Sequence, residues 1–410
     1  MTRSLLGLNG LNFFTAAVQA GFGPFIAVWL TQSGWTLEAL GLVLSAGTLA
    51  APIGQLPGGM LVDQIHAKRT VAAGALIALG ASALMLCLAP TLPIVWGAQI
   101  AHGLASCVMT PVIAALTLSL CGHEKFSEQV GQNTRYAAIG NAASAALLGA
   151  AASSISEQAV FLVTAALVVP ALSTLFMLRA TDRFEPADDH PAMLRPAQRP
   201  HWPWQIFAEP ALHIFAIACV LFQLANAALL PLALNRLTHR GDAPGLLVSA
   251  TIVVPQVITA LIAPWAGRLA QRIGRRPVLL AGFAAVPLRA LLFALLPGAL
   301  PLAAFQALDG VSAAAFGLML PLIAADVTKR TGYLNLAIGA LGLASGLGAT
   351  FSTAAAGWIG ERLGDRATFL LLAAAGASAV ALLWAAMPET RPAQKRRVRV
   401  PNADNATQSA

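Results

Sequence analysis

The stretch GMLVDQIHAKR at residues 59–69 lies between two long apolar runs, and a related stretch returns later in the chain. The second copy reads GRLAQRIGRRP and occupies residues 267–277. A shift of 208 positions aligns the first glycine of each copy and places Asp63 opposite Gln271. Because this shift is close to half of the 410 residues, the chain is expected to consist of two related halves.

Composition indicates an integral membrane protein. Hydrophobic residues make up 57% of the chain and charged residues 10%, whereas ordinary soluble domains contain about 45–50% and about 25%. The net charge of +8 would also suit a nucleic-acid binder. The basic residues, however, sit in short clusters between apolar runs and form no continuous face, so nucleic acid is not an expected partner.

The apolar runs predict twelve membrane spans, since one span needs about 20 mostly apolar residues. Their predicted ranges are 5–30, 38–62, 70–90, 93–121, 129–152, 157–179, 209–235, 244–267, 277–296, 300–326, 334–359 and 367–387. The polar segment 180–208 is expected to be a mobile linker between the halves. Residues 391–410 are expected to form a disordered tail.

The distribution of basic residues predicts the orientation, because loops on the cytoplasmic side carry an excess of Lys and Arg. With the N-terminus in the cytoplasm, 19 of the 25 Lys and Arg residues fall on that side and 4 on the other. The remaining two, Arg135 and Arg289, lie within spans. We therefore expect a multi-pass protein of the bacterial inner membrane with both termini in the cytoplasm.

The two halves agree beyond the basic loops. At a shift of 207, the aligned pairs are Gln19 with Asn226, Pro24 with Pro231, Gln99 with Gln306, and His102 with Asp309. Duplicated sets of membrane helices of this kind are typical of secondary transporters.

The first basic loop resembles the signature of the major facilitator superfamily, which is glycine-x-leucine-alanine-aspartate-arginine-x-glycine-arginine-lysine between the second and third helices. The resemblance covers residues 5 to 390. It implies an all-α membrane protein with twelve transmembrane helices in two pseudo-symmetric six-helix bundles. The bundles would span residues 1–179 and 209–390, with 180–208 as the cytoplasmic linker and 391–410 as the cytoplasmic tail.

In this superfamily the loop aspartate is a gate element that pairs with basic loop residues and faces the start of the eleventh span. Asp63 occupies this position, and a carboxylate is favoured near a helix N-terminus; the alternative is a solvated loop carboxylate. Because the second copy has Gln271 instead, the charge pairing that closes the gate is expected to be asymmetric, with the Asp63 side dominant. The residues assigned to the gate are Gly59, Asp63, Lys68, Arg69, Gly267, Arg272, Gly274, Arg275 and Arg276.

Arg289 and Asp309 are the first candidates for proton coupling. Both are expected near the middle of a hydrocarbon core about 30 Å thick, where a charge costs at least about 2.5–3.5 kcal/mol. They form either a protonatable site beside the substrate path or a static ion pair. His102, which could titrate near physiological pH, is the third candidate, although a histidine among apolar residues is more often neutral. It replaces the glutamine of the superfamily's arginine-x-x-glutamine-glycine signature, and Gln99 replaces the arginine.

Uncharged polar side chains fall mostly on the spans that line the central cavity in the superfamily. The candidate substrate contacts are Asn12, Gln19, Gln99, Asn141, Gln223, Asn226, Gln256 and Gln306, and Gln55 belongs to the same set. Hydrogen bonding between helices is an alternative role for some of them.

The resemblance implies a secondary transporter that moves a small solute by alternating access, driven by a proton gradient. Export is favoured, and the alternative is proton-coupled uptake of a small organic solute or anion. An enzyme is not expected, because the chain lacks His-Glu-x-x-His, Gly-x-Ser-x-Gly and a nucleotide-binding Gly-Lys-Ser/Thr loop. A non-transporting sensor is not expected either, since the linker and tail are short. The expected partners are a small-molecule substrate, protons and membrane lipid, for a monomer without cofactor or metal.

Overall fold

The computed structural model describes residues 3–22, 24–88, 91–178, 202–239, 245–296 and 298–391. Across these ranges the chain is helical and contains no strand, which confirms the predicted all-α class. Most of the predicted linker and all but the first residue of the predicted tail lie outside the described residues. The end of the linker range forms the short 3-10 helix η2 (Pro203–Ala208).

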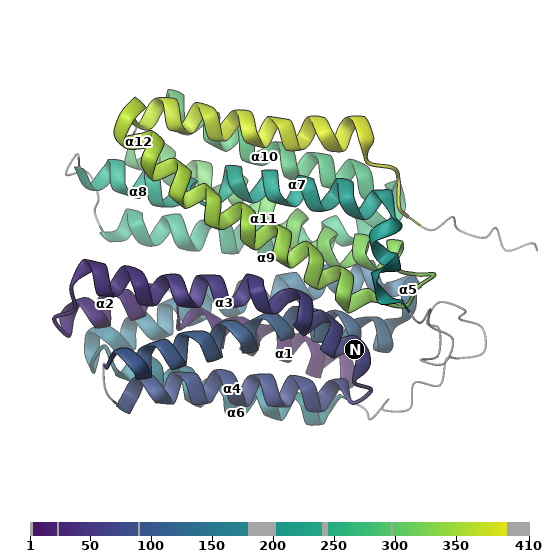
Figure 1. The fold of residues 1–410 in the computed structure, drawn as a ribbon, viewed down its shortest axis with the longest axis horizontal. Coiled ribbons are helices and arrows are strands. Elements are labelled where there is room, and N and C mark those ends of the chain that lie inside the picture. Colours follow the sequence, from purple (N-terminus) through teal and green to yellow (C-terminus); the bar gives the residue numbers. More distant parts are fainter. Residues whose placement is uncertain are drawn as a thin grey trace, which may run out of the picture.

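The helices form two halves of the same design, which Figure 1 shows one above the other. The N-terminal half contains α1 (Arg3–Ala20), α2 (Pro24–Gln32), α3 (Leu37–Gln64), α4 (Lys68–Leu88), α5 (Leu92–Ser154) and α6 (Ala159–Met177). The C-terminal half contains α7 (Pro210–Asn226), α8 (Leu229–His239), α9 (Gly245–Ile273), α10 (Arg275–Leu295), α11 (Ala299–Val327) and α12 (Leu334–Ala386).

Two of these helices, α5 and α12, each contain two membrane spans. Gly122 in α5 has φ 63° and Gly364 in α12 has φ 78°, and neither is helical. A positive φ is accessible to glycine because it has no Cβ, so each helix is interrupted at this residue. Within the described residues, eight helical segments are long and apolar enough to cross a membrane, if α7 and α8 are counted together as one. With α5 and α12 divided, and with α1–α2 and α3 added, the described residues form the twelve predicted spans.

The first and seventh spans, predicted at 5–30 and 209–235, are each divided into two helices in the structure. The first span divides between α1 and α2, directly before Pro24, and the seventh divides between α7 and α8, shortly before Pro231. Proline has no N–H and its ring clashes with the carbonyl four residues earlier, so it suits the first turn of a new helix. The sequence repeat at these prolines thus corresponds to a structural repeat.

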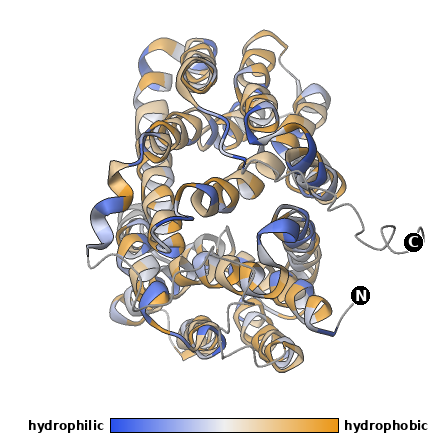
Figure 2. Ribbon diagram, turned by 90° about the vertical axis from the view of Figure 1, so that its right-hand side faces the viewer, coloured by the Kyte–Doolittle hydropathy of each residue, from blue (hydrophilic) through white to orange (hydrophobic). Residues whose placement is uncertain are grey.

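The outer surface of the bundle is apolar. Large hydrophobic side chains such as Val169, Phe176 and Trp384 are exposed, and Figure 2 shows hydrophobic colour on the outer helices of both halves. Apolar patches of this extent are unusual on soluble monomers and suit contact with lipid.

The halves meet through α3 packed on the first part of α12 and the second part of α5 packed on α9. Glycines allow these close approaches, as at other membrane helix interfaces. A Cβ added to Gly59 would lie 2.1 Å from the Asn335 carbonyl oxygen, and one on Gly131 would lie 2.6 Å from the Ala263 carbonyl oxygen. These interfaces bring together the end of the molecule that carries Lys68 and Arg275, which we call the basic end.

Candidate functional site

A cavity of about 510 Å³ lies between the two halves, lined by α1, α3, α5, α11 and α12. Its size falls in the range of about 300–1,000 Å³ that is usual for small-molecule sites. The polar lining residues are Asn12, Thr15, Gln19, Gln55, Thr110, Asn133, Thr134 and Ser345. The apolar lining includes Phe316, Leu320 and Ile338.

Asn12, Gln19 and Gln55, which the sequence marked as candidate substrate contacts, line this cavity. Thr15 also lines it but was missed, although the sequence contained a signal for it. Asn12, Thr15 and Gln19 are separated by three and four positions, a spacing that places them on one face of α1. The hydroxyl of Thr15 belongs to the same polar stripe as the two amides.

The other candidate contacts lie outside the lining of this cavity. Gln99 is buried in α5, and Asn141, Gln223 and Gln256 are half-buried in α5, α7 and α9. Asn226 and Gln306 have a different role, because both hydrogen bond to Arg289.

Arg289 of α10 is the centre of a buried polar cluster. Its side chain is 2% exposed and pairs with the Asp309 carboxylate of α11, which is 23% exposed. Nη1 donates to Gln306 Oε1 at 3.1 Å, and Nη2 donates to Asn226 Oδ1 at 2.8 Å. The guanidinium also lies 5.9 Å from the centroid of the Phe293 ring. A buried cation needs a counter-charge and hydrogen bonds, and here one carboxylate and two amides supply them.

This cluster is joined to the break in the seventh span. Asn226 is the last residue of α7, and two residues later the Ala228 N–H donates to Ser352 Oγ of α12 at 3.1 Å. Backbone groups freed by a helix break inside a membrane need other partners. The break is therefore held by Arg289 through Asn226 on one side and by Ser352 on the other.

His102 lies in a different place from the other two coupling candidates. Its ring stacks on Phe22 beside the break in the first span, with 3.8 Å between the ring centroids. Nε2 is 3.3 Å from Ser106 Oγ, and the buried Nδ1 has no hydrogen-bond partner in the described part of the chain. His102 thus belongs to the N-terminal half, whereas Arg289 and Asp309 pair within the C-terminal half.

Asp63 forms the first contact that closes the basic end. It is buried at the end of α3 and accepts hydrogen bonds from the start of α12, across the interface between the halves. The donors are the Leu336 N–H at 2.8 Å, the Asn335 N–H at 3.3 Å and the Asn335 side-chain amide at 2.8 Å. The free N–H groups and the dipole of a helix N-terminus favour a carboxylate. We call this contact the first lock.

The basic residues that follow Asp63 also bind backbone carbonyls of their own half. Lys68 Nζ donates to the Val62 carbonyl, and Arg69 Nη2 donates to the Leu175 carbonyl of α6 at 2.8 Å. In the other half, Arg276 similarly donates to the Trp384 carbonyl of α12. Each half thus ties the start of its third span to the end of its sixth through an arginine.

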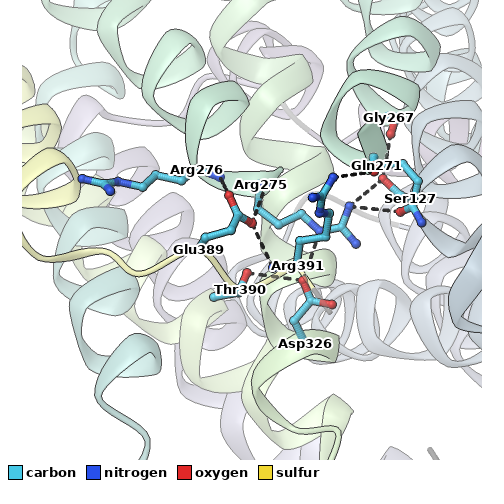
Figure 3. Close-up of polar contacts among 9 residues, drawn as sticks. All are labelled: Ser127, Gly267, Gln271, Arg275, Arg276, Asp326, Glu389, Thr390 and Arg391. Atoms are coloured by element: carbon cyan, nitrogen blue, oxygen red, sulfur yellow. Dashed lines mark hydrogen bonds and ion pairs between the residues drawn. The ribbon is translucent and has the colours of Figure 1, made fainter. Parts of the chain in front are cut away.

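The second lock is built differently (Figure 3). Ser127 Oγ of α5 donates to the Gly267 carbonyl of α9 at 2.7 Å and accepts from Arg275 Nη1 at 3.1 Å. Arg275 Nε pairs with the Asp326 carboxylate at 3.0 Å. Gln271, the counterpart of Asp63, contacts Arg275 Nη1 through Oε1 at 3.4 Å. Ser127 and Asp326 could not be predicted from the loop signature, because neither has a counterpart in it.

Glu389, which follows the last span, caps the start of α10. Its carboxylate accepts from the N–H groups of Arg275 at 2.8 Å, Arg276 at 3.1 Å and Arg391 at 2.9 Å. Burial raises the pKa of Glu389, but these hydrogen bonds outweigh it and hold the pKa below its ordinary value. Gly274 makes room for the carboxylate, because a Cβ there would lie 2.3 Å from a Glu389 oxygen, and its φ of 112° also favours glycine.

The remaining gate residue, Arg272, lies on the same surface of the basic end. Its carbonyl and that of Gln271 accept from Arg391 Nη1. Among the described residues, no group of three His, Cys, Asp or Glu side chains could hold a metal ion.

Comparison with known proteins identifies the chain. The model of the MFS_1 like family matches residues 5–386. The chain belongs to this family of major facilitator transporters. An uncharacterized MFS-type transporter of Mycobacterium tuberculosis, known from two strains, is 35% identical over 395 residues, which cover 93% of each chain. The family and these relatives support a transporter rather than an enzyme.

Solved MFS structures share the fold at low sequence identity. The human organic anion transporter MFSD10 (TETRAN) is 15% identical with a TM-score of 0.72, covering 93% of this chain and 99% of that one. The E. coli fucose:proton symporter FucP is 16% identical with a TM-score of 0.69, covering 93% of this chain and 97% of that one. These likenesses confirm the MFS fold of twelve transmembrane helices in two six-helix bundles.

Proposed function

We propose that this protein is a proton-coupled secondary active transporter that exports a small solute across the inner membrane by alternating access. The observation that carries the proposal is the buried Arg289–Asp309 pair, joined through Asn226 to the break in the seventh span. Asp309 is the partner that a proton can reach, because its side chain is 23% exposed while that of Arg289 is 2% exposed.

Protonation of Asp309 would change the balance of the cluster. Arg289 would keep two neutral amides but lose its counter-charge, and an uncompensated buried cation is strongly unfavourable. A shift of Asn226 and of the adjoining break then relieves the imbalance. In this way one proton alters the backbone between α7 and α8, which couples proton binding to the shape of the C-terminal half.

The two locks supply the other part of the proposal. If the basic end faces the cytoplasm, as its Lys and Arg content favours, both termini are cytoplasmic and the structure represents a state closed to that side. Transport would then require the Asp63 contacts with α12 and the Arg275 contacts with Ser127 to break in each cycle. The halves 1–179 and 209–390 would rock against each other, with 180–208 as their link.

The test uses protein reconstituted in liposomes, with proton flux driven by solute gradients as the readout. The panel contains arylalkyl amides, alcohols, amines and carboxylates. The wild type should move protons with at least one of these solutes, and Asp309→Asn should abolish that flux while solute exchange without a pH gradient continues. Asp365→Asn is the matched control, because Asp365 lies 3.9 Å from Arg236 and is 40% exposed. Retained proton flux in Asp309→Asn would end the proposal, and its sign relative to solute flux distinguishes export from uptake.

A further inference from the structure

The cavity between the halves has an uncharged lining. All lining residues among the described parts of α1, α3, α5, α11 and α12 are apolar, amide or hydroxyl residues. Arg289 and Asp309 do not supply a lining charge, because they pair with each other and are not among the lining residues. An ion entering this cavity would lose hydration without gaining a counter-charge, which is strongly unfavourable.

The N-terminal half forms a polar wall of the cavity, and three of its side chains have no hydrogen-bond partner among the described residues. Thr15 is 4% exposed, and its Oγ1 has no hydrogen-bond partner within the described residues. The side-chain amides of Gln19 and Gln55 likewise have no hydrogen bond to any described residue, and both line the cavity. Buried polar atoms are normally satisfied by protein, water or ligand. Three groups that line one cavity and lack partners among the described residues therefore indicate a place where a ligand's polar groups bind.

The C-terminal half forms an apolar wall opposite. Phe316, Leu320 and Ile338 line it, and Phe316 is fixed by stacking on Phe222 with 4.8 Å between the ring centroids. Its polar residue, Ser345, donates its hydroxyl to the Leu341 carbonyl of its own helix at 2.7 Å. Ser345 therefore offers no free donor to a ligand. The two walls differ in chemistry, and each belongs to a different half.

We propose that the cavity binds a neutral amphiphile whose amide or hydroxyl end faces Thr15, Gln19 and Gln55 and whose aromatic or aliphatic body lies on the Phe316 wall. The inference rests on the proposed transport function and specifies the substrate class of its site. Because the two walls move with different halves, a ligand that spans both holds them together while it is bound.

The binding experiment uses four probes with one carbon skeleton: 4-phenylbutanamide, 4-phenylbutan-1-ol, 4-phenylbutylammonium and 4-phenylbutanoate. Affinities are measured by ligand-observed NMR on the protein in nanodiscs, and empty nanodiscs correct for partition into lipid. The amide and alcohol should bind at least about fivefold more tightly than either ion. Gln55→Leu and Thr15→Val should each weaken amide binding about 2- to 10-fold, the range expected for one hydrogen bond.

Phe316→Ala should weaken all four probes, since it removes the apolar wall. Thr353→Val is the matched control for Thr15→Val, because Thr353 is exposed on α12 and outside the cavity, and it should leave binding unchanged. Melting temperatures verify that each variant is folded. Equal or tighter binding of either ion, no binding of the neutral probes, or unchanged amide affinity in both polar-wall variants would each overturn the inference.

The outcome is separable from that of the transport proposal. Binding needs no gradient, so Asp309→Asn should still bind the amide. Amide binding without proton flux for any solute would overturn the proposed coupling alone. Proton flux with only the amine or the carboxylate would overturn the neutral-ligand inference alone.

Discussion

The two halves repeat the same fold but not the same charges. The third spans, α4 and α10, begin at Lys68 and Arg275, an offset of 207 residues. At that offset the counterpart of Arg289 is Ser82, and the counterpart of Asp309 is His102. Ser82 donates its hydroxyl to the Leu79 carbonyl of its own helix, and His102 stacks on Phe22. The same positions thus support a neutral helix contact in one half and a buried ion pair in the other.

Comparison of the halves shows where a duplicated membrane protein can specialise. In the N-terminal half His102 of the fourth span stacks on Phe22 at the break in the first span, whereas in the C-terminal half Arg289 of the third span donates to Asn226 at the corresponding break. A polar contact beside the break is therefore common to both halves, and the charge is a property of one half. We expect proton sensitivity to follow the charge and therefore to reside in the C-terminal half.

The largest difference in stability should be between a variant at Arg289 and a variant at its counterpart, Ser82. Arg289→Ala leaves Asp309 without its counter-charge and Asn226 and Gln306 without their donor. Breaking a buried ion pair by removing one partner costs about 3–5 kcal/mol. Ser82→Ala removes one intrahelical hydrogen bond, worth about 0.5–1.5 kcal/mol. Thermal unfolding in nanodiscs should rank the variants in this order, and equal destabilisation would remove the energetic basis of the comparison.

An intermediate difference is expected between variants of the two locks, in how far each variant opens the basic end. Asp63→Asn removes the charge that accepts from Asn335 and Leu336 and turns an amide N–H towards their donors. Hydrogen bonds to charged groups contribute about 1.5–3 kcal/mol. The equilibrium constant between the open and closed states of the basic end should therefore shift about 10- to 100-fold towards the open state. Gln271→Ala, at the aligned position, should change that equilibrium little.

Distances between spin labels across the basic end measure this opening. The labels can be placed at exposed residues on α4 and α10, such as Thr70 and Pro277. If Gln271→Ala opened the basic end as much as Asp63→Asn, the asymmetry of the locks would be wrong.

The smallest effect concerns pH and the start of the third span in each half. In the N-terminal half a neutral carbonyl, that of Leu175, binds Arg69, whereas in the C-terminal half the Glu389 carboxylate also caps α10. The pKa of Glu389 is held below its ordinary value of 4.5. Its contribution to stability is therefore fully present above about pH 4.5 and is lost as the pH falls through the lower folded-state value.

Glu389→Gln should accordingly reduce the fall in melting temperature between pH 6 and pH 3, by a small amount because the carboxylate is largely exposed. Glu361→Gln, an exposed position on α12, serves as the control and should leave the pH profile unchanged. An identical profile for the wild type and Glu389→Gln would show that the cap adds nothing measurable.

The sequence predicted the repeated helices well because that information is local. Apolar runs define spans, and basic turns such as Lys68-Arg69 define the loops between them. The breaks at Pro24 and Pro231 were visible as a repeated residue but not as a repeated break, because membrane helices also tolerate proline, as α3 does at Pro52 and Pro57. Asp63 was placed near the start of the eleventh span only through the family resemblance.

The site itself was predicted less completely, for a physical reason. Polarity inside a span shows that a side chain avoids lipid, but it does not show whether the partner is a ligand or another helix. Gln19 faces the cavity and Gln306 binds Arg289, although their sequence environments are alike. Ser127 and Glu389 were missed because their partners are distant in sequence, and their contacts depend on how the two halves and the last residues pack.

The position of Glu389 has a consequence for how the molecule is completed during synthesis. The carboxylate that caps α10 follows the last span, so it leaves the ribosome only after every helix has been made. Until then the first N–H groups of α10 lack this partner, whereas the start of α4 can bind the Leu175 carbonyl as soon as α6 is in place. The N-terminal half can therefore mature first, and the start of α10, which supplies Arg275 to the second lock, acquires its cap only when the chain is almost finished.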